Sequence, residues 1–543
     1  MNRLARRGAA LLLVLLAALA LLRISDGYRV FTNTFDEVAH IATGMQWLDT
    51  GRYEYEPQHP PMRAVYAVGP RLLGVHAFGE ADMWSEGRRI LYEGGNYRRI
   101  LTAARLAALP FFLLTLAVVG VWAARIGGSA AAVAAVFAYS MLPLALAHAG
   151  LATTDTPVTA TLALAFFAWA LFLESPRPER AMFFGTAAGL AVLSKFSALL
   201  FLGLTALGSG LIWLLRKAGP ERRIRLRVLA RALWAVPIGL FVLWAGYRFS
   251  YAPPVDATHP PYGALDRLFG SRGGLHDVAH RLVELPMPMP EFVRGLQDVL
   301  DHNARGHGSF FMGKVASHGH WDFFPVGIVV KTPIPFLLLA LAGLIVIAWM
   351  AWRAAPPTTW IPGLGALLIL VSCLPSSINI GMRHILPMFP LLAVSAGMGF
   401  AALWRSPIGA KRLGPVLGLV MLGWLGVSSL RAHPDYLAYF NECFQHEPQR
   451  WLVDSDLDWG QDLDRLAAAL KRRGVNEVHL DYFGTADTSR HGMPHVEPLV
   501  HQTSVHGWVA VSEYWLAMGR NRWLDAYEPT ERIGRSIRLY QLP

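Results

Sequence analysis

Two carboxylates stand side by side directly after the first apolar segment of the chain, Asp36 and Glu37. A third, Asp155, lies in a short connection between two later apolar segments. An acid inside a membrane helix costs about 2.5–3.5 kcal/mol, so acids beside such helices are usually interfacial or functional. A carboxylate in such a place can take a proton from a hydroxyl group. The three acids are therefore candidate catalytic residues; the structural alternative is that Thr34 or Asp36, and likewise Asp155, cap helices.

Basic groups at the edges of apolar segments are candidates for binding an anion. Lys195, Arg383 and His384 each lie at such an edge. Fixed cations stabilise negative charge that develops during a reaction, so these three residues are candidate anion ligands. The alternative is that their side chains reach the lipid headgroups, as cations at helix ends often do.

Further candidates lie in polar segments between the apolar ones. His59 and Arg63 belong to the sequence EPQHPPMR, whose tandem prolines predict an extended backbone before another helix. His307 belongs to a Gly-rich segment that also holds His302, His318 and His320. The spacing of these four histidines fits no tight structural zinc pattern.

A calcium loop is suggested and then excluded by the sequence after position 453. Asp454, Asp456 and Asp458 match the first acids of an EF-hand loop. The sixth position is Trp459 where the loop needs Gly, and the twelfth is Arg465 where it needs Glu. The sequence therefore predicts no calcium site there.

The elements that position these residues must be membrane helices. Of the 543 residues, 54% are hydrophobic and 16% charged, and the mean hydropathy is +0.35. Soluble domains have about a quarter charged residues. The net charge of +11 comes from short basic clusters between apolar runs. This pattern is typical of cytoplasmic loops and not of a nucleic-acid-binding surface.

Eleven segments are long and apolar enough to predict transmembrane helices. We read the first as an uncleaved span with the N-terminus in the cytoplasm, because basic residues then fall in alternate connections, including 216–227 and 404–412. The eleven predicted spans are 8–23, 103–124, 129–147, 156–173, 181–194, 197–215, 228–246, 326–349, 360–378, 385–403 and 413–430.

The long polar segments then lie on the outer side. They are the loops 24–102 and 247–325 and the tail 431–543. The tail combines a helical pattern at 461–473 with β-type runs at 475–483, 507–511 and 536–539. We predict an all-α polytopic membrane domain over residues 1–430 and a small α/β domain over residues 431–543.

Several short motifs in this order resemble the GT-C class of membrane glycosyltransferases, in particular glycosyltransferase family 39, the protein O-mannosyltransferase-like branch. Phe35-Asp36-Glu37, His59-Pro60-Pro61 and Asp155 match its first two outer segments. The similarity continues through the sequences LSKF at 193–196, GH at 306–307, VKTP at 330–333, MRHILP at 382–387, YFNE at 439–442 and VDSDLDWGQD at 453–462.

The resemblance implies transfer of a sugar from a polyprenyl-phosphate donor to a hydroxyl on a protein, lipid or glycan, at the outer face of the cell inner membrane. Asp36 would be the general base of an inverting displacement, and Glu37 and Asp155 would orient substrates. Lys195, Arg383 and His384 would bind the donor phosphate, and His59, Arg63 and His307 would contact substrate. No cofactor is certain; because some members of the class use a divalent metal, that cofactor stays open.

Two departures from the family pattern bear on the substrate. Met62-Arg63 follows the His-Pro-Pro motif where mannosyltransferases commonly have Leu and a later Lys, and the luminal β-trefoil insertion is missing. Both favour a bacterial enzyme that uses another sugar or acceptor. The alternative function is a secondary transporter with Asp36, Asp155 and Lys195 as ligands, although the sequence shows no internal repeat and its acids lie at one face.

Overall fold

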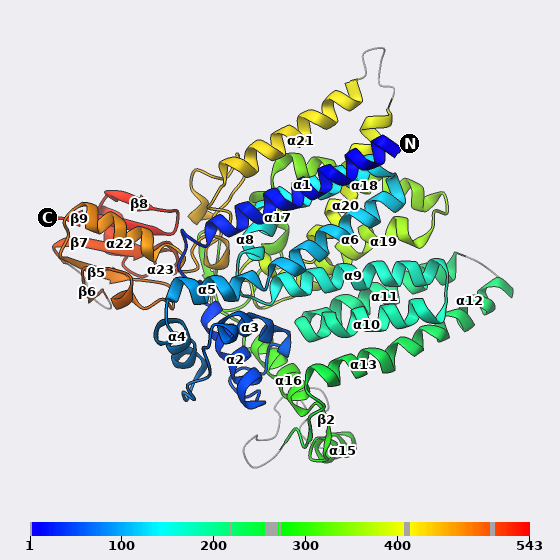
Figure 1. Cartoon of the computed structure of the whole chain (residues 1–543), viewed down its shortest axis with the longest axis horizontal. Coiled ribbons are helices and arrows are strands. Elements are labelled where there is room, and N and C mark those ends of the chain that lie inside the picture. The colour runs from blue at the N-terminus through cyan, green and yellow to red at the C-terminus, as the bar shows by residue number, and fades with distance from the viewer. Residues whose placement is uncertain (1–2, 217–219, 256–269, 271–272, 407–412, 500–504) are drawn as a thin grey trace.

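The computed structural model describes residues 3–216, 220–255, 270, 273–406, 413–499 and 505–543. Parts of the predicted loop 247–325 and of the connections 216–227 and 404–412 lie outside the described residues. The described chain is mainly helical, with a small sheet close to its C-terminus (Figure 1).

The membrane part is built from helices, most of them apolar. They are α1 (Arg3–Gly27), α5 (Tyr97–Leu106), α6 (Leu109–Gly127), α7 (Ser129–Ser140), α8 (Pro143–Ala149), α9 (Asp155–Glu174), α10 (Pro178–Ser194), α11 (Ser197–Leu215), α12 (Pro220–Ala230), α13 (Ala235–Gly246), α17 (Phe323–Lys331), α18 (Ile334–Trp352), α19 (Pro357–Cys373), α20 (Met388–Arg405) and α21 (Leu413–Arg431).

Helices cover each of the eleven predicted spans. In the described residues, eight helices are long and apolar enough to cross a membrane, or nine if α7 and α8 form one span bent by 64° before Pro143. Helices α10 and α19 have 17 residues each, which is short for a span. The predicted single span 326–349 is wrong in detail: the chain breaks at Thr332-Pro333, between α17 and α18.

The outer loops fold into short helices. The first loop contains α2 (Glu37–Thr50), the 3-10 helix η1 (Pro61–Ala64), α3 (Val65–Leu72) and α4 (Met83–Glu93). The second contains α15 (Gly274–Val283), α16 (Pro290–Arg305) and two antiparallel strand pairs, β1 (Tyr251–Ala252) with β2 (Met287–Pro288) and β3 (Ser309–Phe311) with β4 (Lys314–Ala316). Figure 1 shows α2, α3 and α4 at the lower left of the bundle and α15 and α16 below it.

The tail forms an α/β unit, as predicted. Its sheet has the order β6-β5-β7-β9-β8, with β5 parallel to β6 and β7 and antiparallel pairs for β7 with β9 and β9 with β8. The strands are β5 (Glu477–Asp481), β6 (His495–Pro498), β7 (Gly507–Ser512), β8 (Glu531–Ile533) and β9 (Ile537–Leu542), with helices α22 (Leu463–Arg472) and α23 (Glu513–Ala517). The sequence analysis missed the short strands β6 and β8.

The tail is tied to the helix bundle through two of the sequence motifs. Nδ2 of Asn441 donates to the carbonyls of Val329 and Thr332, 2.6 and 3.0 Å away, at the break between α17 and α18. Nζ of Lys331 donates to the carbonyl of Leu437 at 2.6 Å and lies 4.5 Å from the centre of the Phe440 ring. These motifs therefore stabilise the carbonyls that the break leaves without helical partners.

Close helix packing in the bundle depends on glycine. A Cβ atom added to Gly343 on α18 would lie 1.6 Å from the carbonyl oxygen of Ser395 on α20. Small residues allow membrane helices to approach in this way.

We expect Gly343→Ala to destabilise the bundle, because the two helices must separate to admit the methyl group; overpacking of this kind costs about 1–3 kcal/mol. Gly203→Ala on α11 is the control, because a Cβ there meets nothing within 4 Å. Thermal unfolding in detergent should show a lower midpoint for the first variant and an equal or higher midpoint for the second. Equal midpoints for Gly343→Ala and the wild type would contradict the prediction.

Candidate functional site

The centre of the site is an ion pair between two residues that are 347 positions apart. Nη1 of Arg383 donates to Oδ2 of Asp36 over 2.5 Å. Arg383 lies on the 3-10 helix η3 (Met382–Ile385) before α20, and Asp36 precedes α2. Burial lowers the pKa of Arg383, but the negative charges of Asp36 and other carboxylates outweigh it, so the pKa is raised and the guanidinium stays charged.

The side chain of Asp36 does not cap its helix. Asp36 occupies the N-cap position of α2, yet its side chain makes no capping hydrogen bond. Among the described residues no hydrogen bond reaches its Oδ1, and 26% of the side chain is exposed. The capping alternative is therefore wrong for Asp36, and one carboxylate oxygen is left available to a ligand.

The guanidinium of Arg383 is fixed by the tail. It lies over the ring of Trp459, 4.3 Å from the ring centre. Both carboxylate oxygens of Asp456 accept from the backbone N–H of Met382, at 3.1 and 3.2 Å. Gly381 has φ +151°, and a Cβ on it would come within 2.0 Å of Ser455 Oγ, so only glycine allows the two segments to lie this close.

A second ion pair joins two of the other predicted residues. Nζ of Lys195 donates to Oδ1 of Asp155 over 2.7 Å, and Oγ1 of Thr153 approaches Oδ2 at 3.2 Å. Lys195 directly follows α10, Asp155 begins α9, and the Lys195 side chain is 13% exposed. Lys195 therefore points into the protein, not toward lipid headgroups.

Two histidines lie close to both ion pairs. Burial lowers the pKa of His59 and of His384 well below the usual range, and the positive charges of Lys195 and Arg383 lower both further. Both imidazoles are therefore neutral at pH 7. Among the described residues Nδ1 of His59 and Nε2 of His384 are buried without a hydrogen-bond partner, as is Nε of Arg383. Unpaired buried groups of this kind are costly unless a ligand or water satisfies them.

Glu37 occupies a different position from its neighbour Asp36. Its fully buried carboxylate accepts hydrogen bonds from Nε and Nη2 of Arg105 at 2.8 and 2.7 Å, from the backbone and hydroxyl of Thr34 at 2.8 and 3.1 Å, and from the backbone N–H of Ala152 at 2.9 Å. Burial raises its pKa, but Arg105 and these donors outweigh burial and hold the pKa below the usual value. Glu37 thus joins the first outer loop to α5 and to the turn before Asp155.

Arg63 is likewise enclosed within its own loop. Its side chain is fully buried, its Nε donates to Tyr53 Oη over 2.8 Å, and its two terminal nitrogens donate to the side chain and the carbonyl of Glu56. Nε2 of His59 lies 3.7 Å from the same Glu56 carboxylate. Arg63 therefore shapes the segment that carries His59.

His307 pairs with another histidine of the second outer loop. Its Nδ1 lies 3.3 Å from Nε2 of His302, and burial lowers the pKa of both. In the part of the chain that the structure describes, no three His, Cys, Asp or Glu side chains form a group that could hold a metal ion. The residues present do not fit a metal, so we derive no step through one.

The structure thus brings Asp36, His59, Asp155, Lys195, Arg383 and His384 to one end of the bundle. Sequence reasoning did not find Arg105, Glu56 or Trp459, which hold these residues in place. The only signal for Trp459 was its place in the motif 453–462, which offered no partner.

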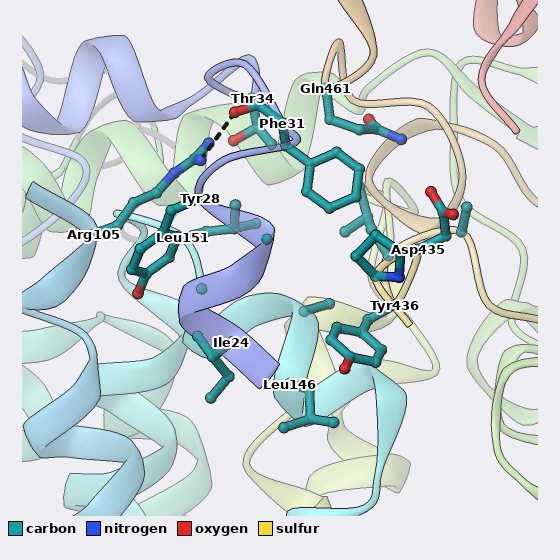
Figure 2. Close-up of a pocket in the computed structure, with 16 residues that line it drawn as sticks. Ile24, Tyr28, Phe31, Thr34, Arg105, Leu146, Leu151, Asp435, Tyr436 and Gln461 are labelled. Atoms are coloured by element: carbon teal, nitrogen blue, oxygen red, sulfur yellow. Dashed lines mark hydrogen bonds between the residues drawn. The ribbon is translucent and has the colours of Figure 1, made fainter. Parts of the chain in front are cut away.

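A small cavity lies behind the first outer loop. It has a volume of about 50 Å³ and is lined mainly by apolar groups of α1, α8 and the segment 434–438. Figure 2 shows Arg105 at its edge, where Nη1 donates to the carbonyl of Phe31 over 3.3 Å. None of the six residues gathered at the end of the bundle lines it, so this cavity is not the reaction pocket.

Residues 99–244, about a quarter of the chain, match the family model described as dolichyl-phosphate-mannose-protein mannosyltransferase. Over this segment the chain is similar to that family. The segment contains Asp155 and Lys195, which form the second ion pair. No curated protein sequence matches the chain.

Solved structures of membrane glycosyltransferases share the fold. The Saccharomyces cerevisiae protein O-mannosyltransferase Pmt1-Pmt2 complex bound to the sugar donor aligns over 78% of this chain and 89% of its own, with 11% identity and a TM-score of 0.51. ArnT from Cupriavidus metallidurans bound to undecaprenyl phosphate aligns over 97% of both chains, with 15% identity and a TM-score of 0.48. The Pmt1-Pmt2 match confirms the predicted fold class, and the family model over residues 99–244 supports the predicted resemblance and the glycosyltransferase class.

Removing the charge of Glu37 should destabilise the protein, because Glu37→Gln leaves Arg105 buried without its partner; breaking such a pair costs about 3–5 kcal/mol. The control is Glu93→Gln, which breaks an exposed pair with Arg89 and should cost less than about 1 kcal/mol. Thermal unfolding in detergent measures both.

The effect of Glu37→Gln should also depend on pH. The folded state lowers the pKa of Glu37 below its usual value of 4.5. The wild type should therefore be more stable than Glu37→Gln by the full amount above pH 4.5, and the difference in stability should disappear as the pH falls through the folded-state pKa. A difference in unfolding midpoint that stayed constant down to acid pH would show that Glu37 does not stabilise through its charge.

Proposed function

We propose that the protein transfers a sugar from a polyprenyl-phosphate donor to a hydroxyl group, at the membrane face that carries the tail. The observation that carries the proposal is the meeting of Asp36 and Asp155 with Lys195 and Arg383, beside neutral histidines whose buried nitrogens lack partners among the described residues. The family that matches residues 99–244 is named for a lipid-phosphate sugar donor, which supports this chemistry.

The donor phosphate would bind at the two cations. Among the described residues Nε of Arg383 has no partner, and the Lys195 side chain is 13% exposed, so both cations would be within reach of a phosphate bound in the site. A guanidinium fixed on the Trp459 ring loses little freedom when it binds an anion. Neutral His384 and His59 can each donate or accept one hydrogen bond to the phosphate or to the sugar hydroxyls.

Asp36 would act as the general base. The acceptor hydroxyl gives its proton to the free Oδ1 of Asp36 while its oxygen attacks C1 of the sugar. The bond from C1 to the phosphate oxygen breaks on the opposite side, and its electron pair leaves with the polyprenyl phosphate, which Lys195 and Arg383 stabilise. One displacement inverts C1.

Glu37 and Arg63 would have positioning roles in this scheme, because protein groups occupy their polar atoms. Asp155 would orient Lys195, and His307 would lie on the acceptor side with His302. Figure 1 shows the N-terminal end of α1 and the tail at opposite ends of the bundle. With a cytoplasmic N-terminus, the site would face outward from the inner membrane.

Asp36→Asn should remove sugar transfer and keep donor binding, because the amide cannot take the proton but leaves the cations in place. The rate should fall by about 10²–10⁴-fold. Purified protein is incubated with a panel of polyprenyl-phosphate sugars and acceptor hydroxyls, and the products are measured by mass spectrometry. Transfer by the Asp36→Asn protein at the wild-type rate would show that Asp36 is not the general base, and a wild type that transfers no sugar would favour the transporter alternative.

Lys195→Gln should weaken donor binding more than it weakens protein stability, because it removes one charge from the phosphate site. Lys314→Gln on the exposed hairpin strand β4 is the control and should bind the donor like the wild type. Binding of a radiolabelled polyprenyl-phosphate sugar in detergent measures the difference. Equal affinity for both variants would place the phosphate elsewhere.

A further inference from the structure

The tail brings a carboxylate of its own to the Asp36–Arg383 pair. Asp454 begins the 3-10 helix η5 (Asp454–Asp456), and its φ of +55° is unusual for a residue other than glycine. Such a backbone conformation is strained and persists only where its surroundings impose it.

The surroundings of Asp454 fix it from both sides. Before it, Leu452 bridges to Phe311 of the second outer loop. After it, the carbonyl of Trp459 accepts from the backbone N–H of Phe35 of the first outer loop, over 3.0 Å. Both outer loops therefore hold the segment between these residues.

The carboxylate of Asp454 is buried and only half satisfied. Oδ1 accepts from the backbone N–H of Ser455 over 2.6 Å. Among the described residues no hydrogen bond reaches Oδ2, although the residue is only 9% exposed. Because the protein does not enclose this oxygen, it can meet solvent or a bound ligand.

The charged neighbours of Asp454 belong to several elements. Arg383 on η3 attracts its negative charge, while Asp36 and Asp456 repel it, and Tyr514 on α23 also faces it. Burial is the largest influence and, with the two carboxylates, raises the pKa of Asp454 to about 7 despite Arg383. Lys331 on α17 donates to the carbonyl of Asp456.

We propose that Asp454 is a positioning residue of the donor site, where it competes with the donor phosphate for the charge of Arg383. This inference rests on the proposed function. When Asp454 is ionised, its negative charge lies near Arg383 and weakens the attraction of the guanidinium for a phosphate. When Asp454 is protonated, that charge is gone and Arg383 attracts the phosphate more strongly.

Donor binding should therefore weaken as the pH rises through 7. The probe is decaprenyl methyl phosphate, a phosphodiester that carries one negative charge throughout this range. We expect its affinity for the wild-type protein in detergent to fall by about tenfold between pH 6 and pH 8. Asp454→Asn should bind at both pH values about as the wild type does at pH 6.

Two further variants separate positioning from a structural role. Asp454→Glu should restore a fall in affinity with pH. Asp481→Asn, which removes another buried tail carboxylate that bonds to Asn521, should leave the wild-type pH dependence unchanged. Thermal unfolding of every variant identifies any that fails to fold. If Asp454→Asn does not fold, the pH dependence of Asp454→Glu is used in its place.

The outcomes distinguish this inference from the function on which it rests. If the wild type binds the probe and Asp454→Asn keeps the same fall with pH, Asp454 has no part in the donor site and the inference is overturned. If the wild type binds no probe at any pH, the proposed donor site itself fails. The inference is supported if the affinity of Asp454→Asn for the probe does not change with pH while that of Asp481→Asn falls as the pH rises.

Discussion

The ion pair between Arg383 and Asp36 is the constraint on which the rest of the site depends. A guanidinium buried at the end of a helix bundle must be paired, because an isolated buried charge would cost several kcal/mol. The tail supplies the ring of Trp459 beneath Arg383, and Asp456 holds the backbone at Met382. The site therefore forms only when membrane helices, the first outer loop and the tail are assembled together.

Three ion pairs at this end of the bundle differ in how many of their polar atoms are left available to a ligand. Glu37–Arg105 is closed, because every carboxylate oxygen has donors within the protein, and it serves to join segments. Lys195–Asp155 is partly open, and Arg383–Asp36 leaves a carboxylate oxygen and a guanidinium N–H free. Adjacent residues of one motif thus have different roles, since burial and the number of donors decide what each carboxylate can still bind.

The sequence was sufficient for the membrane class, for most of the predicted spans and for one helix and three strands of the tail, because periodicity and apolar length are local signals. It did not predict the break between α17 and α18. It also selected Asp36, Asp155, Lys195 and Arg383 from their place at helix ends. It could not show that Glu37 is enclosed or that Trp459 lies under Arg383. Those facts depend on contacts between residues hundreds of positions apart, such as the pair 347 positions apart at the centre of the site.

The tail adds carboxylates around Arg383 and so affects which of the acidic groups there are ionised. Carboxylates outnumber the cations around Arg383, and burial makes the full ionised set expensive, so one carboxylate is best kept neutral. Asp454 is the least stabilised of them in its charged form, since only Arg383 and one backbone N–H offset its burial. Arrival of an anionic donor adds a further negative charge at the same place and favours the proton on Asp454 still more. The donor and that proton should therefore bind cooperatively, and Arg383 is the group through which each senses the other.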